Sequence, residues 1–150
     1  MTQEEIKIFI KVITDYFQSV TGIKASMGIP YVKDNPKPTF DFTAIIGISG
    51  SRKGGICYSA DRSLLKKIAT HILGDDEEEY DDAAIYDLVG EITNVIAGNL
   101  RESFGSSFFI SVPIIIKGKM DDITLKLSPP FYIIPINWDK YQSYLIIGLE

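Results

Sequence analysis

The chain has 150 residues, of which 45% are apolar and 11% aromatic, and this is enough to bury the core of one compact domain spanning residues 1–150. The composition therefore excludes intrinsic disorder. The formal charge of -5, from 15 Lys and Arg against 20 Asp and Glu, gives no general attraction for phosphate backbones or anionic lipid. We expect neither nucleic acid nor a membrane as a partner.

Signals for export, disulfides and metal binding are weak. The longest uncharged run, residues 103–116, is too short for a membrane helix and contains a proline and four serines. Charged side chains fill the first turns of the chain, so no signal-peptide segment is expected. The single Cys57 cannot form an internal disulfide, and Cys57 with His71 is too little for a thiolate and imidazole metal site. We predict a cytoplasmic protein with no cofactor on the chain.

The first half of the chain predicts one helix followed by extended segments. A helix over 3–20 begins behind a capping box formed by Thr2 and Glu5, and Gly22 ends it. Extended segments are predicted at 23–33, 39–48 and 54–59. Residues 49–54 are glycine-rich but lack the spacing of a P-loop, so we interpret them as a hairpin turn with two solvated basic residues.

The second half predicts two helices and then more strands. One helix runs from 62 to 73 behind Asp61 and stops at Gly74, and a longer one covers 82–104. The acidic run at 75–79 is typical of a solvated loop, and Asp81 and Asp82 should cap the next helix. Extended segments follow at 110–117, 122–128, 131–137 and 142–149, with Pro113 and Pro135 marking edges or bulges.

The order helix then strands occurs twice, and an offset of 83 residues relates the two halves. This offset superposes Gly22 on Gly105 and Pro30 on Pro113. We therefore predict an α+β fold of internally duplicated helix-plus-strands units, with a mostly antiparallel sheet and long helices packed on one face.

The helix predicted at 82–104 has a clear apolar stripe centred on Ile92. Its members are Ile85, Leu88, Val89, Ile92, Val95 and Ile96. Asn99 and Ser103 fall on the same side, so we expect Asn99 to face inward and to satisfy backbone groups.

The opposite side of this helix is an unusual surface, made of Asp87, Gly90, Glu91, Asn94, Ala97, Gly98 and Arg101. An exposed glycine within a helix costs about 1 kcal/mol relative to alanine, so the two glycines need a reason. One reason is that small residues let another macromolecule approach the helix backbone. The alternative is that the helix packs through its glycines against another helix of its own fold.

The polar residues of this side indicate part of an active site. Neither Asp87 nor Glu91 has a cation four residues further along the helix, so both carboxylates are available to a partner. Glu91 and Asn94 project from the same face; an amide cannot act as a base but can position water, whereas a carboxylate can be a base or pair with a cation. Nothing nearby in the sequence supplies a nucleophile or metal cluster, so the substrate must bring the electrophile and the metal.

The segment 87–99, with the sequence DLVGEITNVIAGN, resembles the signature helix of the CheC/CheX/FliY chemotaxis phosphatases. Other segments resemble CheX proteins in the expected order over nearly the whole chain. They are residues 45–50 with Gly54 and Gly55, residues 72–74, and residues 111–113.

The resemblance implies a phosphatase acting on a phosphorylated CheY-like receiver protein, which keeps its aspartyl phosphate and Mg²⁺ throughout. Asn94 would orient water for in-line attack, and Glu91 would pair with the receiver lysine that contacts the phosphoryl group. The rest of the signature surface, Asp87, Gly90, Ala97, Gly98 and Arg101, would contribute to receiver binding.

The same resemblance implies one site per chain and a homodimer. The offset of 83 places Ile8 and Lys11 where Glu91 and Asn94 would be repeated, so the first helix carries no motif. A single motif is similar to CheX rather than to the two-site CheC proteins, and CheX proteins are homodimers.

Two other functions remain open from the sequence. One is a non-catalytic domain of the same fold that binds a receiver or a flagellar-switch protein. The other is a small-ligand sensor, for which the sequence offers no polar cluster. We expect Cys57 and Trp138 to be buried for packing, and His71 to pack or to lie on the surface.

Overall fold

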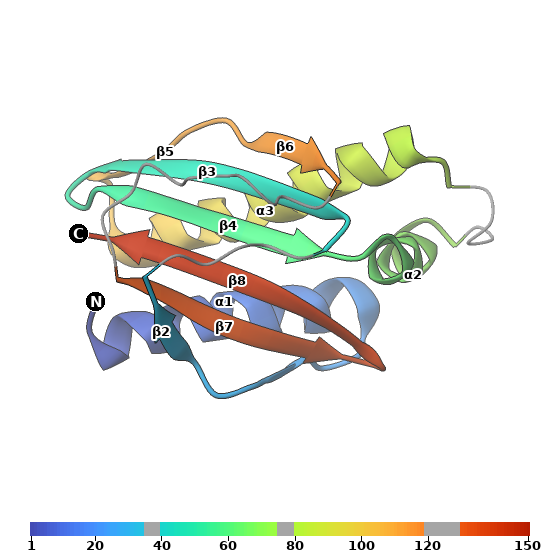
Figure 1. The fold of residues 1–150 in the computed structure, drawn as a ribbon, viewed down its shortest axis with the longest axis horizontal. Helices are drawn as coiled ribbons and strands as arrows, with labels where there is room; N and C mark the ends of the chain where they lie inside the picture. The colour runs from blue at the N-terminus through green and yellow to red at the C-terminus, as the bar shows by residue number, and fades with distance from the viewer. Residues whose placement is uncertain (35–39, 75–79, 119–129) are drawn as a thin grey trace.

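The computed structural model describes residues 1–34, 40–74, 80–118 and 130–150. These residues form three helices and an eight-stranded antiparallel sheet (Figure 1), which confirms the predicted α+β class. The helices are α1 (Gln3–Thr21), α2 (Arg62–Leu73) and α3 (Asp82–Phe104). The strands are β1 (Ser26–Met27), β2 (Tyr31–Lys33), β3 (Phe42–Gly50), β4 (Gly54–Ala60), β5 (Phe108–Ile110), β6 (Ile114–Lys117), β7 (Phe131–Trp138) and β8 (Tyr141–Leu149).

Helix α1 is bounded as the sequence predicts. The backbone N–H of Thr2 donates to the Glu5 carboxylate at 2.8 Å, and that of Glu5 donates to the Thr2 hydroxyl at 3.1 Å. Gly22 ends the helix in the left-handed region, at φ 73°, which glycine adopts without steric cost. The capping box and the glycine stop are therefore both confirmed.

The start of α3 is held by the two carboxylates expected there. The Asp81 side chain accepts a hydrogen bond from the backbone N–H of Ala84 at 2.9 Å. Asp82 accepts from Arg62 Nε at 2.7 Å and lies 2.5 Å from Lys117 Nζ, so it joins the starts of α2 and α3 to the end of β6. The acidic run 75–79 lies outside the described residues.

The strands follow the order β1-β7-β8-β4-β3-β5, with β2 also pairing β7 and β6 also pairing β3. The segment predicted at 23–33 contains two short strands, β1 and β2, and the segment predicted at 110–117 contains the last residue of β5 and all of β6, so each has a break. Pro113 lies in the second of these breaks. Pro135 lies opposite the first: the N–H of Gly28 donates to its carbonyl at 2.9 Å, and a proline nitrogen has no hydrogen to return. The strand predicted at 122–128 lies outside the described residues.

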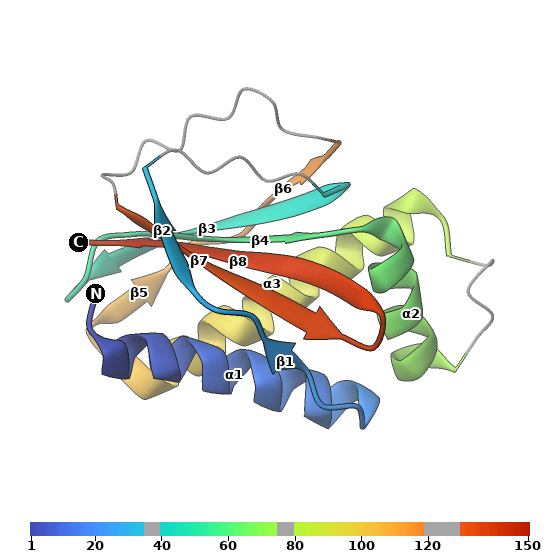
Figure 2. The ribbon, with the colours of Figure 1, turned by 60° about the horizontal axis from the view of Figure 1, so that its bottom comes forward.

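Helices α1 and α3 lie beside each other against the same face of the sheet (Figure 2). The core between these layers is apolar and contains Phe9, Phe17, Tyr58, Ile92 and Trp138. Trp138 is fully buried, and its indole N–H donates to the Thr21 hydroxyl and the Ile23 carbonyl, each at 3.2 Å. Trp138 and Cys57 are both buried, as predicted.

The hairpin turn between β3 and β4 corrects one expectation. Arg52 is not simply solvated: its guanidinium pairs with Glu5 on α1, and its Nε donates to the Glu150 carbonyl at 2.8 Å. Both side chains of the ion pair are about one-fifth exposed. The turn therefore fastens the first turn of α1 to the end of the chain, whereas Lys53 is exposed as expected.

Within the described ranges, no helix is long and apolar enough to cross a membrane.

Candidate active site on helix α3

Glu91 and Asn94 are both exposed on α3, as the sequence predicts. Positions three apart on a helix lie about 60° from each other around its axis, so the two side chains leave the same face of α3 about 5–6 Å apart. Ile92 and Thr93 between them are buried, and the Thr93 hydroxyl donates to the Val89 carbonyl at 2.6 Å. The inner face of α3 thus fixes the direction in which the acid and the amide project.

Two of the small residues expected on the exposed face are buried instead. Ala97 is 1% exposed, and Gly90 is covered by β6: a Cβ at position 90 would lie 2.6 Å from Cδ1 of Ile115. Gly90 therefore serves the packing of α3 inside its own fold, although against a strand and not against another helix. The expectation that both glycines line the exposed surface is wrong for Gly90.

The other residues of the predicted surface are accessible. Asp87, Gly98 and Arg101 are exposed, and a Cβ at position 98 would meet no atom within 4 Å. Among the residues that the structure describes, Asp87 and Glu91 take part in no ion pair. The exposed face of α3 thus combines free carboxylates with one open glycine.

The inner face of α3 differs from the predicted stripe at its far end. Asn99 and Ser103 are exposed, with the Ser103 hydroxyl donating to the Asn99 carbonyl at 3.1 Å, and Val95 is 40% exposed. The expectation that Asn99 faces inward is wrong. The reason is the position of α1, which lies alongside α3 without covering this side.

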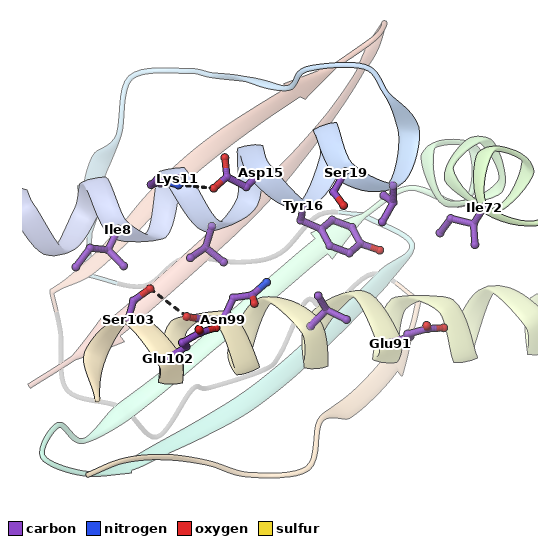
Figure 3. A pocket seen from close by; sticks show the side chains of 13 residues that line it. Ile8, Lys11, Asp15, Tyr16, Ser19, Ile72, Glu91, Asn99, Glu102 and Ser103 are labelled. Atoms are coloured by element: carbon purple, nitrogen blue, oxygen red, sulfur yellow. Dashed lines mark hydrogen bonds and ion pairs between the residues drawn. The ribbon is translucent and has the colours of Figure 1, made fainter. Parts of the chain in front are cut away.

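A groove of about 570 Å³ lies between the exposed sides of α1 and α3 (Figure 3). Val95, Asn99 and Glu102 line it from α3, with Glu91 at one end, and Ile8, Lys11 and Tyr16 line it from α1. A second hollow of about 270 Å³ lies between α2 and α3. Glu91 and Ile72 line both, so the Glu91 carboxylate stands where the two hollows meet.

Helix α1 contributes a wall but no second acid and amide pair. Ile8 and Lys11, which occupy the positions related to Glu91 and Asn94 by the offset of 83, face the groove. Lys11 is paired with Asp15 at 2.5 Å (Figure 3). The described part of the chain therefore holds one Glu and Asn pair, on α3.

Tyr16 is a groove residue that no motif in the sequence indicates. Its side chain is 6% exposed and projects from α1 into the space between the helices (Figure 3). Burial raises the pKa of Tyr16 to about 12, with a further contribution from the negative charge of Glu91. The available signal was its place four residues after the buried Val12, on the inner face of α1.

Within the described residues, the arrangement supplies an unpaired carboxylate and an exposed amide on one helix. No cluster of metal ligands occurs among the described residues. Cys57, the one cysteine of the chain, is on β4 and buried, and burial raises its thiol pKa to about 12, so it offers no thiolate. Glu91 and Asn94 can bind a cation and orient a water, which fits chemistry on a group held by another molecule.

Comparison with known proteins shows the family to which the chain belongs. The model of the chemotaxis phosphatase CheX family matches residues 42–137. The chain is 24% identical over 135 residues to the CheY-P phosphatase CheX of Thermotoga maritima, covering 88% of this chain and 86% of that protein. The chain therefore belongs to the CheX family of chemotaxis phosphatases.

Solved structures of this family share the fold over nearly the whole chain. The chemotaxis protein CheX of Desulfovibrio desulfuricans superposes with a TM-score of 0.83 at 28% identity, over 98% of this chain and 99% of that one. A complex of CheX with CheY, BeF₃ and Mg²⁺ from Borrelia burgdorferi gives a TM-score of 0.78 at 23% identity, over 97% of each chain.

Proposed function

We propose that this protein is a phosphatase that accelerates hydrolysis of the aspartyl phosphate of a CheY-like receiver. The observation that carries the proposal is the exposure of Glu91 and Asn94 side by side on α3, with the Glu91 carboxylate unpaired within the described residues. The family supports it, since the Thermotoga relative is named a CheY-P phosphatase and the Borrelia structure holds CheY with BeF₃ and Mg²⁺.

In this mechanism α3 completes a site whose other half belongs to the receiver. The Asn94 amide holds a water in line with the phosphorus, and Glu91 pairs with the receiver lysine beside the phosphoryl group. Phosphoryl transfer needs mainly positioning and charge stabilisation, which two fixed side chains supply. The Mg²⁺ is expected on the receiver, and none is needed on this chain.

The receiver-binding surface extends from this pair along α3. Asp87, Gly98 and Arg101 are exposed beside Glu91 and Asn94 and are proposed to contact the receiver directly. Gly90 and Ala97, being buried, support that surface from below. The open space at Gly98 lets a partner approach the helix backbone.

We also propose an internally duplicated fold, a homodimer and a cytoplasmic location. The offset of 83 places β1 on Phe109–Ile110, within β5, and β2 on Ile114–Ile116, within β6. The strand order is unchanged when the two halves are exchanged, which supports the duplication.

Three apolar side chains at the β5 end of the sheet support a dimer interface there: Phe109 is 51% exposed, Val112 83% and Ile114 64%.

The test is phosphate loss from several phosphorylated receivers of the same cell, with and without this protein. We expect faster loss from at least one receiver. Glu91→Lys should weaken both receiver binding and turnover, because it opposes the receiver lysine with a like charge. Glu4→Lys makes the same change at the exposed start of α1, outside the groove and the receiver-binding surface, and should leave most of the activity.

The second candidate is a non-catalytic domain that binds a receiver or a flagellar-switch protein. It predicts binding to the phosphorylated receiver without any acceleration of phosphate loss. The exposed acid and amide favour the phosphatase, because binding alone does not require a water-positioning amide beside the carboxylate.

A further inference from the structure

Tyr16 presents a buried ring and an available hydroxyl to the groove beside the proposed site. Its ring and the Phe17 ring form a T-shaped pair, with 5.9 Å between centroids and 82° between the ring planes. Within the described residues, the Tyr16 hydroxyl forms no hydrogen bond. Tyr58, a phenol on β4, is fully buried and donates to the Ser143 hydroxyl at 3.1 Å. Among the described residues, the Tyr58 O–H therefore has an acceptor and the Tyr16 O–H has none.

Three acids line the same groove, and only one suits this hydroxyl. Asp15 is engaged by Lys11 at 2.5 Å. Glu102 lies eleven residues beyond Glu91, about 16 Å further along the helix axis. Glu91 is the acid whose charge reaches the phenol and adds to the rise of its pKa. Figure 3 shows the hydroxyl directed toward the Glu91 end of the groove.

We propose that Tyr16 is a positioning residue whose phenol donates a hydrogen bond to the Glu91 carboxylate when a receiver covers the groove. The inference rests on the proposed phosphatase function and adds a residue from the other helix to its site. One carboxylate oxygen accepts from the phenol, which leaves the second to face the receiver lysine.

The physical reason is the removal of water during docking. In the free protein an exposed carboxylate rotates among rotamers and is solvated. Once the receiver excludes water, the carboxylate needs partners for both oxygens, and a hydrogen bond to a charged group is stronger than one between neutral groups. The Tyr16 ring is already immobile in the core, so a bond from it orders Glu91 at little entropic cost.

The first test is a pH titration of the Tyr16 phenol in the free protein, in which NMR of a ring carbon of Tyr16 reports its ionisation. Glu91→Ala should lower the pKa of Tyr16, because it removes a negative charge that disfavours the phenolate. Glu102→Ala removes a carboxylate from the same groove and should leave that pKa unchanged. An unchanged pKa in Glu91→Ala would overturn the inference.

The second test is a cycle of Tyr16→Phe and Glu91→Ala, measured by receiver turnover and by affinity for a beryllofluoride-loaded receiver with Mg²⁺. Tyr16→Phe keeps the ring and should lower turnover roughly tenfold in the wild-type background, the order expected for a hydrogen bond to a charged group. It should cause no further loss of turnover or affinity when Glu91 is already alanine. Tyr58→Phe, which removes a phenol outside the groove, should keep wild-type turnover.

Two results overturn the inference: Tyr16→Phe with wild-type turnover, or the same fold-loss in both backgrounds, which indicates a structural role only. The failure of the proposed function is distinct. If the wild-type protein leaves phosphate loss from every receiver unchanged, the function is wrong and the positioning role falls with it, whatever the titration shows.

Discussion

Cδ1 of Ile115 covers Gly90, at 2.6 Å from the place that a Cβ at that position would take. Gly98, two turns later on the same helix, has no atom within 4 Å of its own added Cβ. The two glycines of the signature helix therefore have different roles. One lets β6 close over α3, and the other leaves the exposed face of α3 open.

Because of this difference, alanine at position 98 and alanine at position 90 should change the free energy of unfolding by different amounts. Gly98→Ala should raise the free energy of unfolding by about 1 kcal/mol, since alanine is the better helix former and its methyl meets nothing. Gly90→Ala should gain less or nothing, because the Ile115 side chain must move to admit the methyl. Urea unfolding of the two variants measures both. A loss of stability in Gly98→Ala would show that this glycine is required by the fold itself.

Asp82 should contribute to stability in a definite pH range. The hydrogen bonds from Arg62 and Lys117 lower its pKa from 3.8 to about 2, so folding favours the ionised form. The contribution is complete above the unfolded pKa and is lost as the pH falls from about 4 toward 2. Asp82→Asn should flatten the fall in the free energy of unfolding over that range. Asp87→Asn, which removes an exposed carboxylate of the same helix that forms no ion pair among the described residues, is the control for the loss of one charge.

Arg52 should matter more for stability than its neighbour in the turn. Arg52→Ala removes the partly buried ion pair with Glu5 and the exposed hydrogen bond to the Glu150 carbonyl, and should cost about 1–2 kcal/mol. Lys53→Ala removes an exposed side chain and should change the free energy of unfolding by less than about 0.5 kcal/mol. If chemical denaturation gives the same change in the free energy of unfolding for both variants, the contacts of Arg52 with Glu5 and Glu150 do not stabilise the fold.

Cys57 should be unreactive in the folded protein. It is 1% exposed, and burial raises its thiol pKa to about 12, so almost no thiolate is present near neutral pH. A chromogenic disulfide reagent should label it only at the rate of unfolding, and quickly once denaturant is added. Fast labelling of the native protein would contradict this placement of β4.

The boundaries of the helices were predictable because local chemistry sets them. The capping box at Thr2, the carboxylates at Asp81 and Asp82, and the glycine stops act within a few residues, whatever the rest of the fold does. The strand breaks were less predictable. They depend on Pro135 and Pro113 lying beside particular neighbouring strands, which is a property of the sheet and not of the segment.

The faces of α3 were predicted only in part. Glu91 and Asn94 stand outward as expected, because Ile92 and Ile96 fix the inner side. Gly90 and Asn99 were assigned to the wrong sides. A helical projection centred on apolar residues cannot tell that β6 covers one flank of the helix and that α1 leaves the other flank open as a groove.

In the proposed mechanism the Asn94 amide positions the attacking water, and a pair of matched asparagines tests this role. Both Asn94 and Asn99 are exposed on α3, five residues apart, so each can be replaced by alanine with little effect on the fold. The measurement is phosphate loss from a saturating phosphorylated receiver. Asn94→Ala should lower the accelerated rate by about a hundredfold while Asn99→Ala stays close to wild type. Wild-type turnover by Asn94→Ala would contradict the mechanism.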